Sequence, residues 1–297
     1  MTATTSQTRL ATPAIESKHR SEFENAWRRF SANRVALVGL AMLALIVLTA
    51  IFAPVIAPYD PINDMDTSRR GCPPSSDHLF GCDHLGRDLL SRVIFGSRIA
   101  LVAGFTATII SVLIGVVVGA LAGFLGGWTD TIFSRIIDTL MAFPIIALLI
   151  VLASVLGPSL VTTIVVIGVT VWSRYARVVR AEVLSLRERD FVIAAYASGV
   201  RNWRIIWRHL VPNVMGPVIV LASLGVGGII ILEAALSFLG LGVRPPTPSW
   251  GAILADGRAY ILRYPHISFF PGVMIVITVL AFNFVGDGLR DALDPKD

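Results

Sequence analysis

Long apolar runs, separated by short polar segments, are the main feature of this chain. Six such runs occupy residues 35–56, 99–125, 136–156, 159–172, 214–239 and 267–289. Because an α-helix rises 1.5 Å per residue, about 20 apolar residues cross a hydrocarbon core of about 30 Å. The pattern therefore predicts an all-α membrane protein with six transmembrane helices.

The fourth run is the shortest, because Ser173 and Arg174 interrupt it. We expect its helix to continue past Arg177 and Arg180 into the cytoplasm, with these long side chains reaching toward the membrane interface. Before the first run, residues 1–20 are polar and predict a disordered tail. Residues 23–30 mix aromatic and charged side chains, which favours an amphipathic helix at the membrane surface.

The distribution of lysine and arginine sets the orientation of such a bundle. With both termini in the cytoplasm, the inner segments carry 17 of the 25 basic residues. The chain then divides into a few parts in sequence order. We predict a cytoplasmic tail with an interfacial helix (1–34), a first transmembrane helix (35–56), an extracytoplasmic loop (57–97) and a transmembrane core (98–297) with a cytoplasmic loop at 187–213.

Composition narrows the class of function. Hydrophobic residues make up 55% of the chain and charged residues 15%, which excludes an ordinary soluble protein. The net charge of +5 comes from loops that flank the membrane, so we expect lipid and not nucleic acid as its counterpart. Neither lysine, Lys18 or Lys296, follows a glycine, so the chain has no phosphate-binding P-loop. We therefore predict no enzyme activity and no cofactor in this chain.

The segment 187–213 is the longest basic interruption in the carboxy-terminal two-thirds of the chain. Asp190 is a good N-cap residue, Gly199 suits the positive φ that ends a helix, and Asn202 caps a second helix that runs to about His209. Pro212 ends that helix or starts the next element. The prediction is a helix, a glycine turn and a second helix, and the small side chains at 194–198 would let another protein approach closely. An ordinary solvated loop is the alternative.

Asp138 and Glu233 are the acids that fall well inside the predicted spans. An ionisable residue at membrane depth usually faces the bundle interior, a partner or a water path. One interpretation places both in the translocation path or its gate. The other makes them structural acids, with Asp138 paired to Arg135 at the inner interface; we favour this for Asp138 and leave Glu233 open.

Two cysteines and two histidines, Cys72, His78, Cys82 and His84, lie within thirteen residues of the outer loop. A disulfide between Cys72 and Cys82 is the favoured interpretation, because the extracytoplasmic compartment permits oxidation. Free thiols and a zinc site are the alternatives. A disulfide here would stiffen the approach to residues 86–88.

The cytoplasmic segment resembles the EAA loop of ABC importer permeases. The resemblance rests on Ala194-Ala195, on Gly199 four residues later, and on Pro212 thirteen residues after that glycine. Ile193 stands where the family pattern has its glutamate. In that family the loop forms coupling helices that dock on the ATP-hydrolysing subunit, and this implies a coupling role for Asp190, Ala194, Ala195, Ser198, Gly199, Arg201, Trp203 and Arg204.

Two further stretches carry a more specific resemblance. Residues 81–101 (GCDHLGRDLLSRVIFGSRIAL) and 236–251 (LSFLGLGVRPPTPSWG) are similar to signatures of the C-type permease subunit of dipeptide, oligopeptide and nickel ABC importers. The end of the first run, Ala-Pro-Tyr-Asp-Pro61, is also similar. Cys82 stands where that family commonly has threonine. The three motifs occur in the family's order and the resemblance covers almost all of the chain beyond residue 20.

This resemblance implies the type I ABC importer fold in a bacterial plasma (inner) membrane. The expected partners are a second homologous permease subunit, two ATP-binding cassette subunits that carry ATP and Mg²⁺, and an extracytoplasmic substrate-binding protein. The expected cargo is a di- or oligopeptide. Nickel import within the same family, a secondary transporter that works without ATP and a non-transporting membrane scaffold are the alternatives.

Overall fold

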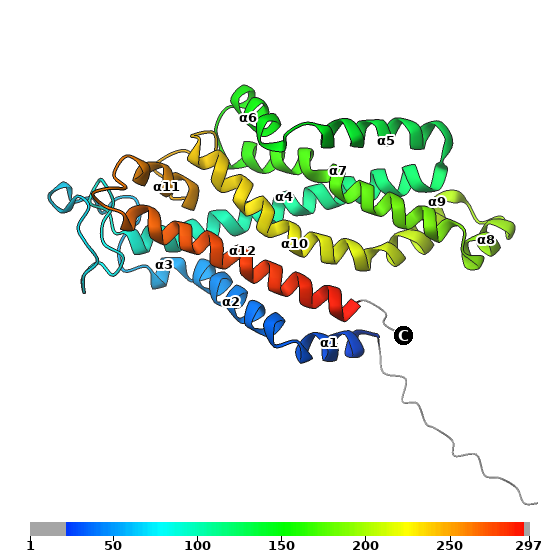
Figure 1. Ribbon diagram of the computed structural model, residues 1–297, viewed down its shortest axis with the longest axis horizontal. Coiled ribbons are helices and arrows are strands. Elements are labelled where there is room, and N and C mark those ends of the chain that lie inside the picture. The colour runs from blue at the N-terminus through cyan, green and yellow to red at the C-terminus, as the bar shows by residue number, and fades with distance from the viewer. Residues whose placement is uncertain (1–21, 294–297) are drawn as a thin grey trace, which may run out of the picture.

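The computed structural model describes residues 22–293, and the regular secondary structure of that part is helical (Figure 1). The predicted tail at residues 1–20 lies outside the described residues. A short 3₁₀ turn (Thr67–Arg69) and a π-helical turn (Ile206–Leu210) accompany the α-helices. These are α1 (Glu22–Ala32), α2 (Arg34–Ile51), α3 (Ala53–Ile56), α4 (Leu89–Leu125), α5 (Gly127–Ala142), α6 (Ile145–Leu156), α7 (Leu160–Arg187), α8 (Asp190–Ala197), α9 (Asn202–Ile205), α10 (Val211–Phe238), α11 (Trp250–Arg258) and α12 (His266–Leu293).

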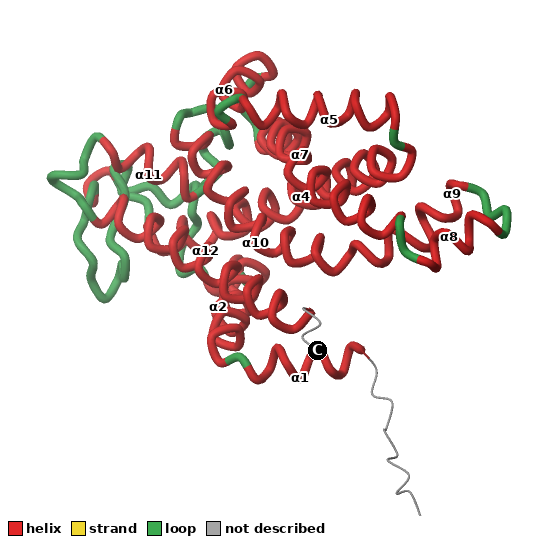
Figure 2. Tube along the Cα trace, turned by 45° about the vertical axis from the view of Figure 1, so that its right-hand side comes forward, coloured by secondary structure: helices red, strands yellow, loops and turns green. Residues whose placement is uncertain are grey.

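The long helices form an elongated bundle. In Figure 1, α2, α4, α7, α10 and α12 run along its long axis. The loops gather with α11 at one end, and α8 and α9 project from the other end (Figure 2). We call the first end the outer cap, residues 57–97 together with α11, and the second the hairpin, residues 190–205.

Four helical segments are long and apolar enough to cross a membrane: α2, α4, the run from Asn202 to Phe238, and α12. A fifth span results if α5 and α6 are counted as one bent span. Helix α7 is 28 residues long, but its second half carries Arg174, Arg177 and Arg180. The structure therefore supports four or five of the six predicted spans, and the number six remains a prediction.

The third predicted span is not one continuous helix. The run 136–156 is divided between α5 and α6, which meet at an angle of 93°. Phe143 has an extended backbone, with ψ 141°, because the ring of Pro144 disfavours helical geometry at the preceding residue. In addition, α5 already begins at Gly127, so Asp130 and Arg135 lie on a helix and not in the loop that the hydropathy pattern indicated.

Helices α4 and α7 pack closely because glycines line their contact. Gly115, Gly119 and Gly123 recur every four residues on one face of α4. A Cβ at Gly119 would collide with Val179 and with the carbonyl of Ala176, and one at Gly123 would meet the carbonyl of Arg180 at 2.9 Å. Without side chains at these positions, the two backbones approach each other as small residues allow in membrane helices.

The two ends of the described chain lie side by side. The Asn33 side chain caps α2 by accepting hydrogen bonds from the backbone N–H groups of Val35 and Ala36. Its amide also donates to Asp291 near the end of α12, with an N–O distance of 3.2 Å. Residues 23–30, predicted as helical, fall within α1, which packs on α12 through Phe30 and Ala292.

Candidate functional site

Both helices of the hairpin begin one residue away from the predicted position. Asp190 and Asn202 are the first residues of α8 and α9, and the N-cap residues are Arg189 and Arg201. Neither N-cap side chain makes a capping hydrogen bond. Asp190 still places its negative charge in the first turn of α8, where the helix dipole favours it.

The turn of the hairpin has the conformation that its glycine predicted. Gly199 has φ +73°. Its N–H donates to the carbonyl of Tyr196 at 3.0 Å, and the N–H of Val200 donates to the carbonyl of Ala195 at 3.2 Å. These two bonds define a Schellman motif, which requires a left-handed residue at this position and therefore favours glycine.

One face of the hairpin anchors it to the bundle and the other is open. Val192 and Ile205 are buried in a cluster with Val179 and Val183 of α7. In contrast, 66% of Tyr196 and 64% of Trp203 are exposed, although both are aromatic. The residues for which the resemblance implies a coupling role lie on or beside this open face. Exposed are Asp190, Ala194, Ser198, Gly199, Arg201, Trp203 and Arg204, and Ala195 is half-buried.

The second helix of the hairpin does not stop near His209. It passes through the π-helical turn Ile206–Leu210 directly into α10, and Pro212 lies in the first turn of α10. Pro212 has no N–H to donate back into the π-helical turn, so the hydrogen-bond pattern is interrupted where that turn meets α10. A continuous helical connection nevertheless joins the hairpin to a long helix of the bundle.

Asp138 pairs with an arginine other than the one expected. Its carboxylate lies 2.5 Å from the guanidinium of Arg177 on α7, and Arg135 is not its partner. Two helices from different parts of the sequence are joined here, and both side chains are more than half exposed. The sequence offered a signal for this contact, since arginines recur every three residues on α7 and acids stand at 130 and 138 on α5.

Glu233 is fully buried near the outer end of α10. Its Oε1 accepts a hydrogen bond from the Ser237 hydroxyl at 2.7 Å. The other oxygen, Oε2, has no partner among the described residues. The backbone of the next residue, Ala234, contacts Gly251 of α11, so Glu233 lies beside the junction of α10 and the outer cap and not on an open face.

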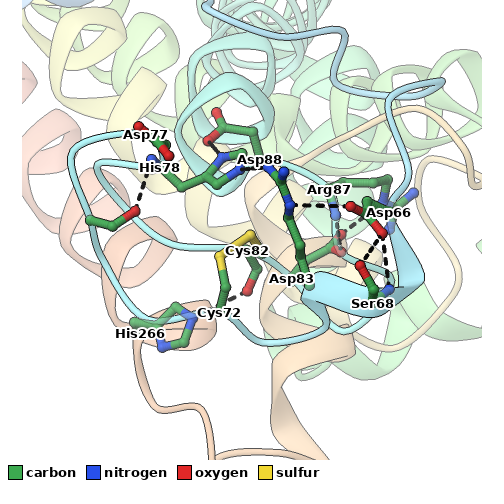
Figure 3. The surroundings of a disulfide bond; sticks show 12 residues. Asp66, Ser68, Cys72, Asp77, His78, Cys82, Asp83, Arg87, Asp88 and His266 are labelled. Atoms are coloured by element: carbon green, nitrogen blue, oxygen red, sulfur yellow. Dashed lines mark hydrogen bonds and ion pairs between the residues drawn. A yellow bond between two sulfur atoms is a disulfide. The ribbon is translucent and has the colours of Figure 1, made fainter.

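A disulfide joins Cys72 and Cys82 in the outer cap (Figure 3). The His266 ring, at the start of α12, lies 3.1 Å from the carbonyl oxygen of Cys82. The sulfur atoms and the His78 ring lie close enough together to resemble a metal-ligand set. With the sulfurs bonded to each other, no thiolate is available to a metal, and His84 instead stacks on Tyr260.

Buried charges tie the outer loop to α4 and α11. Asp83 is 2.7 Å from Arg87 and 3.3 Å from Arg92, and both arginines approach Asp256 of α11 within 4 Å. Asp88 caps α4 by accepting from the Ser91 N–H at 2.7 Å. These contacts explain why α4 begins at Leu89, before the end of the segment predicted as a loop.

Further hydrogen bonds complete the outer cap. The Asp88 carboxylate also lies 2.8 Å from Nδ1 of His78. On the exposed part of the loop, hydrogen bonds from Asn63 hold the pKa of Asp60 below its usual value, and hydrogen bonds from Ser68 do the same for Asp66. Both exposed acids therefore stay ionised and keep their turns formed.

Trp250 is a core residue of the outer cap. It is completely buried, and its indole N–H donates to the carbonyl of Val93 on α4 at 2.9 Å. Gly96 makes room for the ring, because a Cβ there would meet it at 2.7 Å. The two stretches that carried the more specific resemblance, 81–101 and 236–251, thus meet in the outer cap.

Family models match two parts of the chain. Residues 115–296 match the binding-protein-dependent transport system inner membrane component, and this match includes the hairpin. Residues 21–74 match the N-terminal transmembrane domain of oligopeptide transport permease C. Together they confirm the resemblance that the sequence motifs indicated.

Curated relatives cover nearly the whole chain. The dipeptide transport system permease protein of Alkalihalophilus pseudofirmus is 43% identical over 276 residues, which is 93% of this chain and 90% of the relative. The glutathione transport system permease protein of Shigella flexneri is 45% identical over 277 residues, covering 93% of this chain and 91% of the relative.

A solved structure has a similar fold. The MetNI methionine ABC transporter, in an inward-facing conformation, contains a chain that aligns with a TM-score of 0.57 at 20% identity. The alignment covers 69% of this chain and 98% of that one. With the family models and the relatives, it leads to one conclusion. The chain belongs to the family of binding-protein-dependent transport system inner membrane components, the permease subunits of bacterial ABC importers.

Proposed function

We propose that this permease forms half of a membrane path for di- or oligopeptides and is driven through the hairpin by an ATP-hydrolysing subunit. The observation that carries the proposal is the hairpin itself. It projects from the end of the bundle opposite the outer cap, presents the exposed aromatic side chains Tyr196 and Trp203, and continues as a helix into α10 (Figure 1). A push on its open face is therefore transmitted to a long helix of the bundle.

The choice of peptide cargo rests on the relatives. The names of the two relatives above specify a dipeptide and glutathione, and glutathione is itself a small peptide. Both relatives match over more than nine-tenths of this chain. A peptide delivered by an extracytoplasmic binding protein is the cargo consistent with both names.

The arrangement of the chain ends supports the six-span topology with both termini in the cytoplasm. Helix α1 and the end of α12 lie together, and the outer cap with its disulfide lies at the far end of the bundle (Figure 1). A disulfide is stable outside the cytoplasm, which supports an extracytoplasmic position for that cap. We count α7 as a span despite its arginines, and α5 with α6 as one broken span.

The proposed partners follow from the missing P-loop and from the exposed apolar faces of the bundle. No P-loop is present in the sequence, so ATP and Mg²⁺ belong to two cassette subunits that contact the hairpins. A second homologous permease would cover the exposed apolar faces of the bundle and complete the path. The outer cap, held rigid by its disulfide and buried charges, would receive the binding protein.

The test is ATP turnover by the assembled complex in proteoliposomes. Gly199→Pro removes the N–H that closes the Schellman turn, and Ala195→Arg adds bulk on the hairpin. We expect binding-protein-stimulated turnover and peptide uptake to fall at least tenfold in both variants while the permease still inserts. Ala259→Arg, which adds the same side chain to an exposed position after α11, is the control for insertion and basal turnover. Normal stimulated turnover in both hairpin variants would refute the coupling role.

A further inference from the structure

Three arginines, Arg174, Arg177 and Arg180, recur every three residues on α7, and only two of them have acidic partners. Arg177 pairs with Asp138, and Arg180 pairs with Asp130. Arg174 makes no hydrogen bond or ion pair with any other residue in the described part of the chain, and its side chain is exposed. The paired arginines face α5, whereas Arg174 lies further round the helix.

Arg174 lies at membrane depth. Fourteen residues separate it from Leu160 at the start of α7. At 1.5 Å per residue this is about 21 Å along the helix, against a hydrocarbon core of about 30 Å. An unpaired cation at this depth is costly, and such residues usually face a partner or a water-filled path.

A cavity provides that path. Arg174 lines a space of about 330 Å³ between α7 and α10, together with Tyr175, Gly225 and Gly228. Gly228 leaves space beside α10, because a Cβ there would meet nothing within 4 Å, whereas the Tyr175 hydroxyl lies against Gly225. The rest of the lining is apolar apart from the Tyr175 hydroxyl, so Arg174 is the one charged group in this cavity.

A second cavity continues the first toward the hairpin end of the bundle. It has a volume of about 820 Å³ and shares the lining residues Leu221 and Leu224 with the first cavity. Val178 and Glu182 of α7 line it, and these stand four and eight residues after Arg174. Residues at this spacing share one face of an α-helix. One face of α7 therefore lines two adjacent cavities, from Arg174 toward the hairpin.

We propose that Arg174 binds the carboxylate of the cargo as it passes along these cavities, so that the path selects peptides through an anionic end. The inference rests on the proposed function and adds a recognition chemistry to it. Guanidinium and carboxylate form two parallel charge-assisted hydrogen bonds, which are stronger than neutral ones. In an otherwise apolar cavity, this contact compensates both the cation of the protein and the anion of the peptide for lost hydration.

The position of Arg174 argues against a lipid phosphate as its partner. A side chain that reaches for the inner headgroups lies on a lipid-facing surface, whereas Arg174 lines a hollow between two helices of the bundle. A second permease subunit bringing an acid to Arg174 is the competing arrangement. It predicts loss of assembly, and not of selectivity, when the charge is removed.

The experiment uses the complete complex in proteoliposomes with its binding protein, and a free-acid tripeptide as the probe. Arg174→Gln removes the charge, and Arg174→Lys keeps it. Arg135→Gln, on α5 and outside both cavities, is the matched control for loss of an arginine near the inner surface. Initial uptake, binding-protein-stimulated ATP turnover and complex yield are measured for each. The carboxy-terminal amide of the tripeptide is a second probe. Its uptake by each variant is divided by its uptake by the parent, so that the affinity of the binding protein for the amide cancels from the comparison.

We expect Arg174→Gln to lower free-acid uptake about tenfold with turnover and yield retained, as loss of a charge-assisted contact would do. Arg174→Lys should keep most of the uptake, Arg135→Gln should match the parent, and any amide uptake should be equal in Arg174→Gln and parent. If the binding protein rejects the amide, the difference in free-acid uptake between Arg174→Gln and Arg174→Lys decides the question alone. Unchanged free-acid uptake in Arg174→Gln, or loss of complex yield, would overturn the proposal. A parent complex without ATP-dependent peptide uptake would instead refute the proposed function, and the inference with it.

Discussion

Arg180 of α7 holds the carboxylate of Asp130 on α5 with two hydrogen bonds, from Nε at 2.5 Å and from Nη2 at 2.8 Å. Each side chain is less than one-third exposed. The pair joins two helices that are fifty residues apart in the sequence. Because α5 continues through the break at Pro144 into α6, this contact fixes one end of the broken segment to the bundle.

We expect Asp130→Asn to destabilise the permease by about 1–3 kcal/mol, because a charge-assisted bidentate contact is lost. Asp138→Asn is the matched control, since its pair with Arg177 is more than half exposed and should contribute at most about 1 kcal/mol. Thermal unfolding of the detergent-solubilised protein measures both. An equal loss in the two variants would show that the bidentate geometry does not matter.

The glycine contact between α4 and α7 gives a second prediction. Gly119→Leu places a side chain against Val179 and the carbonyl of Ala176, neither of which can move without separating the helices. We expect a strong loss of folded, membrane-inserted protein, measured as monodisperse yield. Gly216→Ala, in α10, meets nothing within 4 Å and should leave the yield unchanged or raise it, because alanine favours a helix by about 0.5–1 kcal/mol over glycine. A normal yield for Gly119→Leu would contradict the packing described above.

Hydropathy located the helices well but did not give their limits or contacts. Apolar runs report where lipid surrounds a helix, so they identified α2, α4, α10 and α12. They missed the first turns of α4, because residues 89–98 are helical within a polar cap held by Asp83 and Asp88. They also joined α5 to α6, because Pro144 in an apolar run is compatible with a kinked helix as well as with a break.

Local backbone chemistry predicted the hairpin turn but not the pairing of side chains. Gly199 has its left-handed conformation because the closing hydrogen bonds need only the nearest residues. The partner of Asp138 depends on how α5 lies against α7, so the nearest arginine in sequence, Arg135, was the wrong choice. The hydrogen bond from Trp250 to Val93 could not be predicted for the same reason, since it spans 157 residues of sequence.

The disulfide of the outer cap gives a third prediction. It closes a loop of about ten residues, and loops of this size contribute about 2–3 kcal/mol through the unfolded state. We expect Cys72→Ser/Cys82→Ser, or treatment with a membrane-impermeant reductant, to lower thermal stability by this amount and to weaken binding-protein-stimulated turnover more than basal turnover. Thiol alkylation of the unreduced, denatured protein should find no free cysteine. Two alkylated cysteines before reduction would show that the bond is absent from the native protein.

Glu233 gives the fourth prediction, because its two carboxylate oxygens have different surroundings. Oε1 accepts from Ser237, whereas Oε2 is buried without a partner in the described structure, and an isolated buried charge there would be costly. Glu233→Gln keeps the shape and an acceptor for Ser237, so we expect near-normal yield and peptide uptake in proteoliposomes. Glu233→Leu leaves the Ser237 hydroxyl without its acceptor, and we expect a loss of about 1–3 kcal/mol in stability. If Glu233→Gln abolishes uptake while the complex stays assembled, the charge itself is needed, and Glu233 belongs to the gate and not to the packing of α10 against the outer cap.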